Sequence, residues 1–254
     1  MKLTLEEYTS LNPRCEIVHK GARMVFVTPN LATKGRVDTI YTKEPCTLEW
    51  IETFSAADVL FDIGANVGMY TIWAAATRGC RVFAFEPEAQ NYALLNRNIE
   101  ANELQDRVKA YCVGVSDRCG FVDLNLGDIP AGGANHALGD ALDYKHEPMK
   151  SRYRQGCVAF TIDQLTELNA LPVPNHIKID VDGIEPKIVA GAAQLLCNPA
   201  VRSVLIEINL NLDDHRAMVD RLTAFGFKAD PVQVQRAMRP DGPYKGVAEH
   251  VFRR

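Results

Sequence analysis

The segment VLFDIGANVGMY, residues 59–70, constrains the fold of this chain more than any other part of the sequence. An apolar run of strand length ends at Asp62, a loop with two glycines follows, and the alanine-rich segment 71–77 then begins. This order predicts a buried parallel strand, a tight loop and the first turn of a packed helix. Gly64 and Gly68 stand where the backbone must bend sharply or approach a ligand closely. Because the free amides at such a helix start can bind a carboxylate or phosphate, the segment predicts a ligand site.

Strands and helices alternate from residue 58 onward, which predicts an α/β fold with a doubly wound, mostly parallel sheet. The expected strands are 58–62, 81–85, 108–113, 157–161, 175–180 and 203–208. The expected helices are 67–77, 88–101, 162–168, 185–196 and 213–224. Apolar segments at 225–227 and 247–252 predict a closing pair of strands, one of them antiparallel.

Two domains are expected, an N-terminal cap over residues 1–50 and a main domain over residues 51–254. Short apolar runs at 17–19 and 24–27 predict a hairpin within the cap. Residues 127–155 break the alternation with several glycines among polar residues, so we expect a long lid or substrate loop there.

Composition narrows the class of protein. The chain has 254 residues, 47% of them hydrophobic and 24% charged, as in soluble globular proteins. The net charge of −4, without a basic run, argues against binding nucleic acid or an anionic membrane. Seven scattered cysteines without a CxxC pair suggest reduced thiols, and no signal peptide or membrane-length apolar run is visible. We therefore expect a cytoplasmic protein.

The second expected strand ends at Glu86, which can hydrogen-bond both ribose hydroxyls of a nucleoside. A dinucleotide-binding loop would read G-x-G-x-x-G, but Asn66 stands at the middle glycine. Asp62 would also repel a pyrophosphate, whereas it suits an amino group or a sulfonium. These features favour S-adenosylmethionine over NAD.

Polar residues follow three other expected strands. Asp117 can accept a hydrogen bond from an adenine amino group, and Asp180 and Asp182 end the strand before 185–196. Glu207 and Asn209 end the next strand. These oxygen donors could hold Mg²⁺, but binding of the methionine part or of substrate hydroxyls explains them better, so we assign no metal site.

A series of motifs in this chain resembles the FkbM-type methyltransferase family. These motifs are residues 43–45, 50–51, 62–68 and 85–87, followed in order by 161–163, 177–183 and 204–209. The resemblance implies methyl transfer from S-adenosylmethionine to a hydroxyl, typically on a sugar, glycan or secondary metabolite. One departure is Asp182-Gly183, where such proteins often carry Glu-Gly. This shorter acid changes what the side chain can reach.

The expected site has two parts. The candidate catalytic residues are His136, Asp180, Asp182 and Lys178, with His136 favoured as general base because histidine titrates near neutral pH. The cofactor is assigned to Glu44, Asp62, Gly64, Ala65, Asn66, Gly68, Tyr70, Glu86, Pro87, Ser116, Asp117 and Asp180. The expected partner is a small-molecule or glycan acceptor, and a homo-oligomer is possible. Two alternatives stay open: an NAD(P)-dependent oxidoreductase and a non-catalytic cofactor-binding module.

Overall fold

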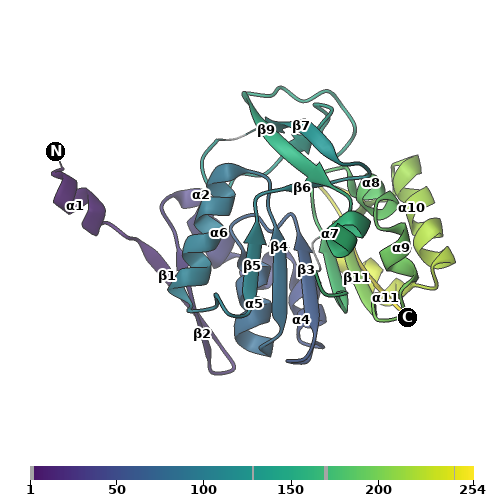
Figure 1. The fold of residues 1–254 in the computed structure, drawn as a ribbon, viewed down its shortest axis with the longest axis horizontal. Coiled ribbons are helices and arrows are strands. Elements are labelled where there is room, and N and C mark those ends of the chain that lie inside the picture. Colours follow the sequence, from purple (N-terminus) through teal and green to yellow (C-terminus); the bar gives the residue numbers. More distant parts are fainter. Residues whose placement is uncertain (1–2, 128, 169–170, 243) are drawn as a thin grey trace.

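A computed structural model describes residues 3–127, 129–168, 171–242 and 244–254 (Figure 1). Its main element is a seven-stranded sheet in the order β12-β13-β11-β10-β3-β4-β5. The strands β11, β10, β3, β4 and β5 are parallel, and β13 runs antiparallel to both β11 and β12. Their bounds are β3 Val59–Ile63, β4 Arg81–Phe85, β5 Val108–Tyr111, β10 His176–Ile179, β11 Ser203–Asn209, β12 Lys228–Ala229 and β13 Val247–Arg253. The predicted doubly wound, mostly parallel sheet is confirmed.

Helices cover both faces of this sheet because its strands are apolar on both sides. One face packs in a single core with α4 Pro45–Ile51, α5 Met69–Arg78 and α6 Ala89–Ala101. The other face packs with α7 Ile162–Leu168, α8 Glu185–Ala190, α9 Ala193–Cys197 and α10 Asp213–Ala224. The remaining helices are α1 Leu5–Ser10, α2 Leu31–Asp38, α3 Ile40–Lys43 and α11 Pro231–Ala237.

The predicted N-terminal hairpin is present as β1 Arg14–His19 and β2 Ala22–Val27. Its apolar residues Met24 and Phe26 are fully buried in the same core as α5 and the large sheet. Within the described residues the cap therefore shares its core with the main domain. Only α1 projects away from the body (Figure 1).

The predicted strand 157–161 exists but does not belong to the large sheet. It is β9, Tyr153–Phe160, in a separate four-stranded sheet of order β6-β9-β7-β8. The others are β6 Gly114–Val115, β7 Gly120–Leu126 and β8 His136–Leu138. Because β9 pairs with β6 and β7 and with no strand of the large sheet, its predicted place in the parallel series was wrong. This small sheet lies above the carboxyl ends of the large one (Figure 1).

Three other boundaries differ. The loop 127–155 contains β8 and the start of β9, and its residue 128 lies outside the described residues. The predicted helix 185–196 is two helices broken around Gly191, whose missing side chain lets the backbone approach the Ser116 carbonyl. The closing strand predicted at 225–227 begins later, at Lys228. Among the described helices none is both long and apolar enough to cross a bilayer.

Candidate functional site

The loop between β3 and α5 is shaped by close backbone contacts. Gly64 has φ +79°, and a β-carbon there would lie 2.0 Å from the carbonyl oxygen of Asp180, the residue after β10. Gly68 has φ +86°, and a β-carbon there would lie 2.4 Å from Leu95 Cδ1. Asn66 is also left-handed, at φ 51°, which asparagine tolerates. Both glycines are thus required by contacts within the protein, as well as by the turn itself.

Glu86 closes this loop from the end of β4. Its carboxylate accepts hydrogen bonds from the Asn66 amide at 2.7 Å and the Glu88 amide at 2.9 Å. The side chain is only 4% exposed and borders a cavity. Burial raises the pKa of Glu86 to about 7, although these two amides oppose the rise. A buried carboxylate at the edge of a cavity could accept hydrogen bonds from two ribose hydroxyls, and this role of Glu86 stays a prediction.

Asp62, the last polar residue of β3, is also buried. Its Oδ2 accepts a hydrogen bond from the Thr71 hydroxyl. Its Oδ1 is buried, and no donor among the described residues bonds to it. Burial raises the pKa of Asp62, while Lys178 opposes the rise. Because an unpaired buried acceptor is costly, this atom fits a cationic ligand group such as an ammonium.

Two adjoining cavities flank the loop and share Gly64, Asn66 and Asp180. We call the first the nucleoside cavity; its predicted site residues are Gly64, Asn66, Glu86, Pro87, His136, Asp180 and Asp182. We call the second the methionine cavity; its predicted site residues are Gly64, Ala65, Asn66, Tyr70, Lys178 and Asp180. The large sheet, the lid and the cap all contribute walls.

The other predicted cofactor residues do not border either cavity. Glu44 and Asp62 are buried beneath them, and Gly68 packs on α6. Ser116 is buried and donates to Asp117, which is exposed. The roles of these five residues remain predictions, and that of Asp117 requires an adenine ring to reach beyond the nucleoside cavity.

Opposite charges fix the end of β10. Lys178 Nζ lies 2.7 Å from Asp180 Oδ2 and 5.0 Å from the centre of the Tyr70 ring. Burial alone would raise the pKa of Asp180, but Lys178 and Lys43 lower it well below its usual range. Burial would lower the pKa of Lys178, yet Asp180 and Asp62 raise it. Asp180 is therefore a permanent charge and a poor proton acceptor at neutral pH.

Asp182 differs from Asp180. It has φ 59° and accepts a hydrogen bond from the Asn135 amide at 2.8 Å. Burial raises its pKa, and the charge on Asp180 adds to the rise. The adjacent His136, the first residue of β8, borders the nucleoside cavity. The structure thus brings together three of the predicted catalytic residues, His136, Asp180 and Asp182, and places Lys178 in the neighbouring cavity.

Two glycines of the lid, residues 127–155, accept hydrogen bonds from the loop between β3 and α5 and from α2. Asn66 Nδ2 donates to the Gly133 carbonyl at 2.7 Å, and Arg36 Nε donates to the Gly132 carbonyl at 2.9 Å. Asn91, fully buried on α6, accepts from the Gly132 amide at 2.7 Å and donates to Gly133 at 3.3 Å. These contacts hold the lid closed over both cavities.

Replacing Asn91 should release the lid. Asn91→Ala leaves the buried Gly132 amide without its acceptor and removes one of the two hydrogen bonds to the Gly133 carbonyl, which we expect to cost about 2 kcal/mol of unfolding free energy. Hydrogen exchange of amides 131–136 should accelerate. Asn96→Ala, on the exposed side of the same helix, is the control. It should change neither the free energy of unfolding nor the hydrogen exchange of amides 131–136. Unchanged exchange in Asn91→Ala would contradict this anchoring role.

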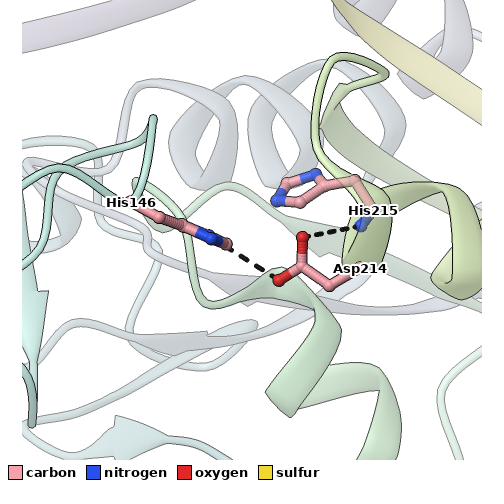
Figure 2. Close-up of side chains that lie close together, drawn as sticks. All are labelled: His146, Asp214 and His215. Carbon is pink, nitrogen blue, oxygen red and sulfur yellow. Dashed lines mark hydrogen bonds and ion pairs between the residues drawn. The ribbon is translucent and has the colours of Figure 1, made fainter.

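Three side chains near the lid come within reach of one possible metal ion, with ligand atoms of His146, Asp214 and His215 within 4.8 Å of one another (Figure 2). However, His215 Nδ1 accepts the Asn209 amide at 3.2 Å, so a neutral ring carries its proton on Nε2. His146 Nε2 lies 3.2 Å from the Gly183 carbonyl, an acceptor. Since both hydrogen bonds would have to break to free ligand lone pairs, we interpret this cluster as a contact between the lid and α10.

Sequence reasoning missed several residues of the site. Arg36 and Lys43 border the methionine cavity, and the α2 and α3 sequences carry no signal for this. Asn91 does have a signal, because it is a polar residue on the apolar side of α6, beside Leu94 and Leu95. Arg239 bonds to Glu207 across 32 residues of sequence, and such a pairing is set by tertiary structure.

The sheet order, with its antiparallel β13, and the acid-ended strands around the loop define a Rossmann-like class I methyltransferase fold. Residues 62–229 match the model of the Methyltransferase FkbM domain. The chain belongs to this family, which confirms the resemblance seen in its motifs.

A curated relative is the hexuronic acid methyltransferase AglP of Haloferax volcanii, 26% identical over 163 residues. The match covers 64% of this chain and 61% of that protein, so the chain spans less than two thirds of its length. Among solved structures, Methyltransferase FkbM from Methylobacillus flagellatus has 15% identity and a TM-score of 0.49, covering 79% of this chain and 44% of that one. TYW2 of P. horikoshii in complex with MeSAdo has 13% identity and a TM-score of 0.46. The match covers 95% of this chain and 70% of that one.

Proposed function

We propose that this protein transfers a methyl group from S-adenosylmethionine to a hydroxyl of a sugar or glycan. The observation that carries the choice of donor is the pair of buried carboxylates around the loop, Asp62 and Glu86. Asp62 Oδ1 is a buried acceptor that suits the amino group of the methionine part, and Glu86 suits the ribose. The bound donor supplies an electrophilic methyl group on a positively charged sulfur.

Further residues of this chain fit the rest of the donor. Arg36, Lys43 and Lys178 border the methionine cavity and favour a carboxylate there. Phe85, Val113 and Val115 provide apolar walls of the nucleoside cavity for a base. Asp180 borders both cavities and Asp182 borders the nucleoside cavity, and the two would orient an acceptor hydroxyl in line with the methyl group.

Support for a sugar acceptor comes from the family and from the relative that acts on hexuronic acid. The lid would form the acceptor pocket, as expected from its position over both cavities. We keep a small-molecule or glycan acceptor as the proposed partner, with a homo-oligomer as a further possibility.

Calorimetric titration with S-adenosylmethionine and, separately, fluorescence titration with NADH test the choice of cofactor. We expect binding of the first and none of the second. A screen of sugars, nucleotide sugars and oligosaccharides for labelled methyl uptake then tests transfer. Retention of NADH without donor binding would replace this proposal with the oxidoreductase alternative. Donor binding without transfer to any acceptor would favour the non-catalytic module.

A further inference from the structure

A row of carboxylates crosses the large sheet beside the cofactor loop. Ile179 on β10 pairs with Ile206 on β11, so the next residues, Asp180 and Glu207, lie side by side. Glu207 pairs in turn with Glu249 on β13. Because neighbours in one row project to the same face, the three acids lie together on the face that packs against α4.

A single guanidinium, that of Arg239, forms ion pairs with two of these acids. Arg239 Nη2 donates to Glu207 Oε1 at 2.7 Å and to Glu249 Oε1 at 2.9 Å. The Glu207 side chain is 15% exposed and that of Glu249 is 5% exposed. Since Lys178 is already paired with Asp180, Arg239 supplies one positive charge for two buried carboxylates. A shared proton relieves this imbalance, so the pair titrates as a unit.

The surroundings of Glu207 favour its protonated form. Burial raises its pKa to about 8, and Asp180 adds to the rise while Arg239 opposes it. Burial raises the pKa of Glu249 to about 7, with Glu44 adding and Arg239 opposing. The charged or titratable groups that interact with Glu207 are Asp180, Glu185, Arg239, Tyr244 and Glu249. Asp180 is in turn paired with Lys178, and Glu249 interacts with Glu44.

Glu207 is connected through Arg239 to aromatic residues of the lid and of the segment after α11. The nucleoside cavity lies over β3 and β4, whereas Glu207 follows Asp180 in the opposite direction along the sheet. There the lid meets the segment after α11, where Tyr144 and Tyr244 stack with ring centres 4.5 Å apart. Arg239 lies 5.2 Å from the Tyr244 ring centre, and stacked tyrosines beside acids and arginine suit a sugar.

We propose that Glu207 is the general base of methyl transfer and that it gives up its proton to solvent when a sulfonium donor binds. The inference rests on the proposed function. An independent observation already points to a cationic ligand on this face, because the buried Asp62 Oδ1 has no donor among the described residues. Asp62 pairs in register with Lys178, two residues before Asp180 in the row.

Glu207 enters the reaction as a carboxylate and takes the proton of the acceptor hydroxyl on Oε2, since Oε1 faces Arg239. As that O–H bond breaks, the acceptor oxygen bonds to the methyl carbon, and the carbon–sulfur electron pair stays on sulfur. Sulfur is then neutral and Glu207 is protonated, which is the charge state of the protein before binding. Asp180 is less suited to this role because Lys178 holds it ionised.

Proton release can be measured without an acceptor. S-adenosylmethionine and S-adenosylhomocysteine differ in the charge on sulfur, so their binding to the wild type is titrated by calorimetry in two buffers of different ionisation enthalpy. At pH 7.5 we expect the charged ligand to release up to about 0.8 protons more than the neutral one, the protonated fraction of a group with pKa near 8. The excess should vanish at pH 9, where Glu207 is already ionised.

Glu207→Gln should lose the additional proton release that S-adenosylmethionine causes compared with S-adenosylhomocysteine. Because both proteins bind the same two ligands, subtracting the variant from the wild type removes any protons that the ligands themselves take up. Glu49→Gln, which removes a surface Glu–Arg pair, is the matched control and should keep it. An equal excess in Glu207→Gln and wild type, or its loss only in Glu249→Gln, would overturn the assignment. If Glu207→Gln fails to fold, the pH series on the wild type decides, since an excess of equal size at pH 7.5 and 9 overturns it.

A kinetic arm separates this inference from the proposed function. With an acceptor from the screen, Glu207→Gln should lower kcat by about 100-fold or more with little change in KM, and the acid limb of the pH profile should disappear. Glu249→Gln should move that limb to lower pH, because Arg239 then serves Glu207 alone. If the wild type binds no donor, the proposed function fails; if it methylates an acceptor and His136→Ala alone removes the limb, only the assignment to Glu207 fails.

Discussion

Gly64→Ala should abolish donor binding and lower the free energy of unfolding by about 4 kcal/mol, a large part of the stability of an ordinary domain. The left-handed backbone at φ +79° costs about 1–2 kcal/mol with any L side chain. The rest arises because the new methyl group would overlap the carbonyl oxygen of Asp180, which is 2.0 Å away and directly follows the neighbouring strand β10. Relief of this overlap must separate β3 from β10, where the two cavities meet.

Gly21→Ala provides the control for the backbone contribution. Gly21 has φ +86° in the hairpin turn, and nothing lies within 4 Å of a β-carbon there. It should therefore cost only about 1–2 kcal/mol and leave donor binding unchanged. Urea denaturation and calorimetry measure both variants. Equal costs for Gly64→Ala and Gly21→Ala would show that the contact with Asp180 is unimportant.

Local patterns in the sequence encode the strands and the loop at the centre of this candidate site. An uninterrupted apolar run means a strand buried on both faces, and Asp62 and Glu86 mark where two such strands end. What local pattern does not reveal is why Gly64 is required. Its closest neighbour is Asp180, more than a hundred residues later, so the constraint belongs to the packing of β3 on β10.

The small sheet was predicted poorly for a related reason. Strands β6 and β8 have only two and three residues, too few to show alternation. Each gains its hydrogen bonds from partners that tertiary structure supplies, β9 for β6 and β7 for β8. The Arg239 bridge between Glu207 and Glu249 is likewise invisible in sequence, although Glu207 itself is visible as the acid that interrupts an apolar strand.

Glu86→Gln should weaken binding of S-adenosylmethionine about 100-fold. Two hydrogen bonds from ribose hydroxyls to a buried carboxylate contribute about 3 kcal/mol together, and a neutral amide keeps only part of this. The amide nitrogen would also face one of the backbone N–H groups of Asn66 and Glu88, which now donate to Glu86. In the wild type, affinity should fall as the pH drops below about 7, because protonation removes the acceptor. Glu86→Gln should lack this dependence.

Glu88→Gln is the control for Glu86→Gln, since both acids are buried and stand two residues apart. Glu88 caps α6 by accepting from the Gln90 and Asn91 amides and does not border the nucleoside cavity. Its loss should cost about 1 kcal/mol of stability and little affinity. Because the ribose is common to the donor and its demethylated product, Glu86→Gln should weaken both ligands equally, whereas Glu207→Gln should alter only the difference between them. Unchanged affinity in Glu86→Gln would remove the ribose from this strand end.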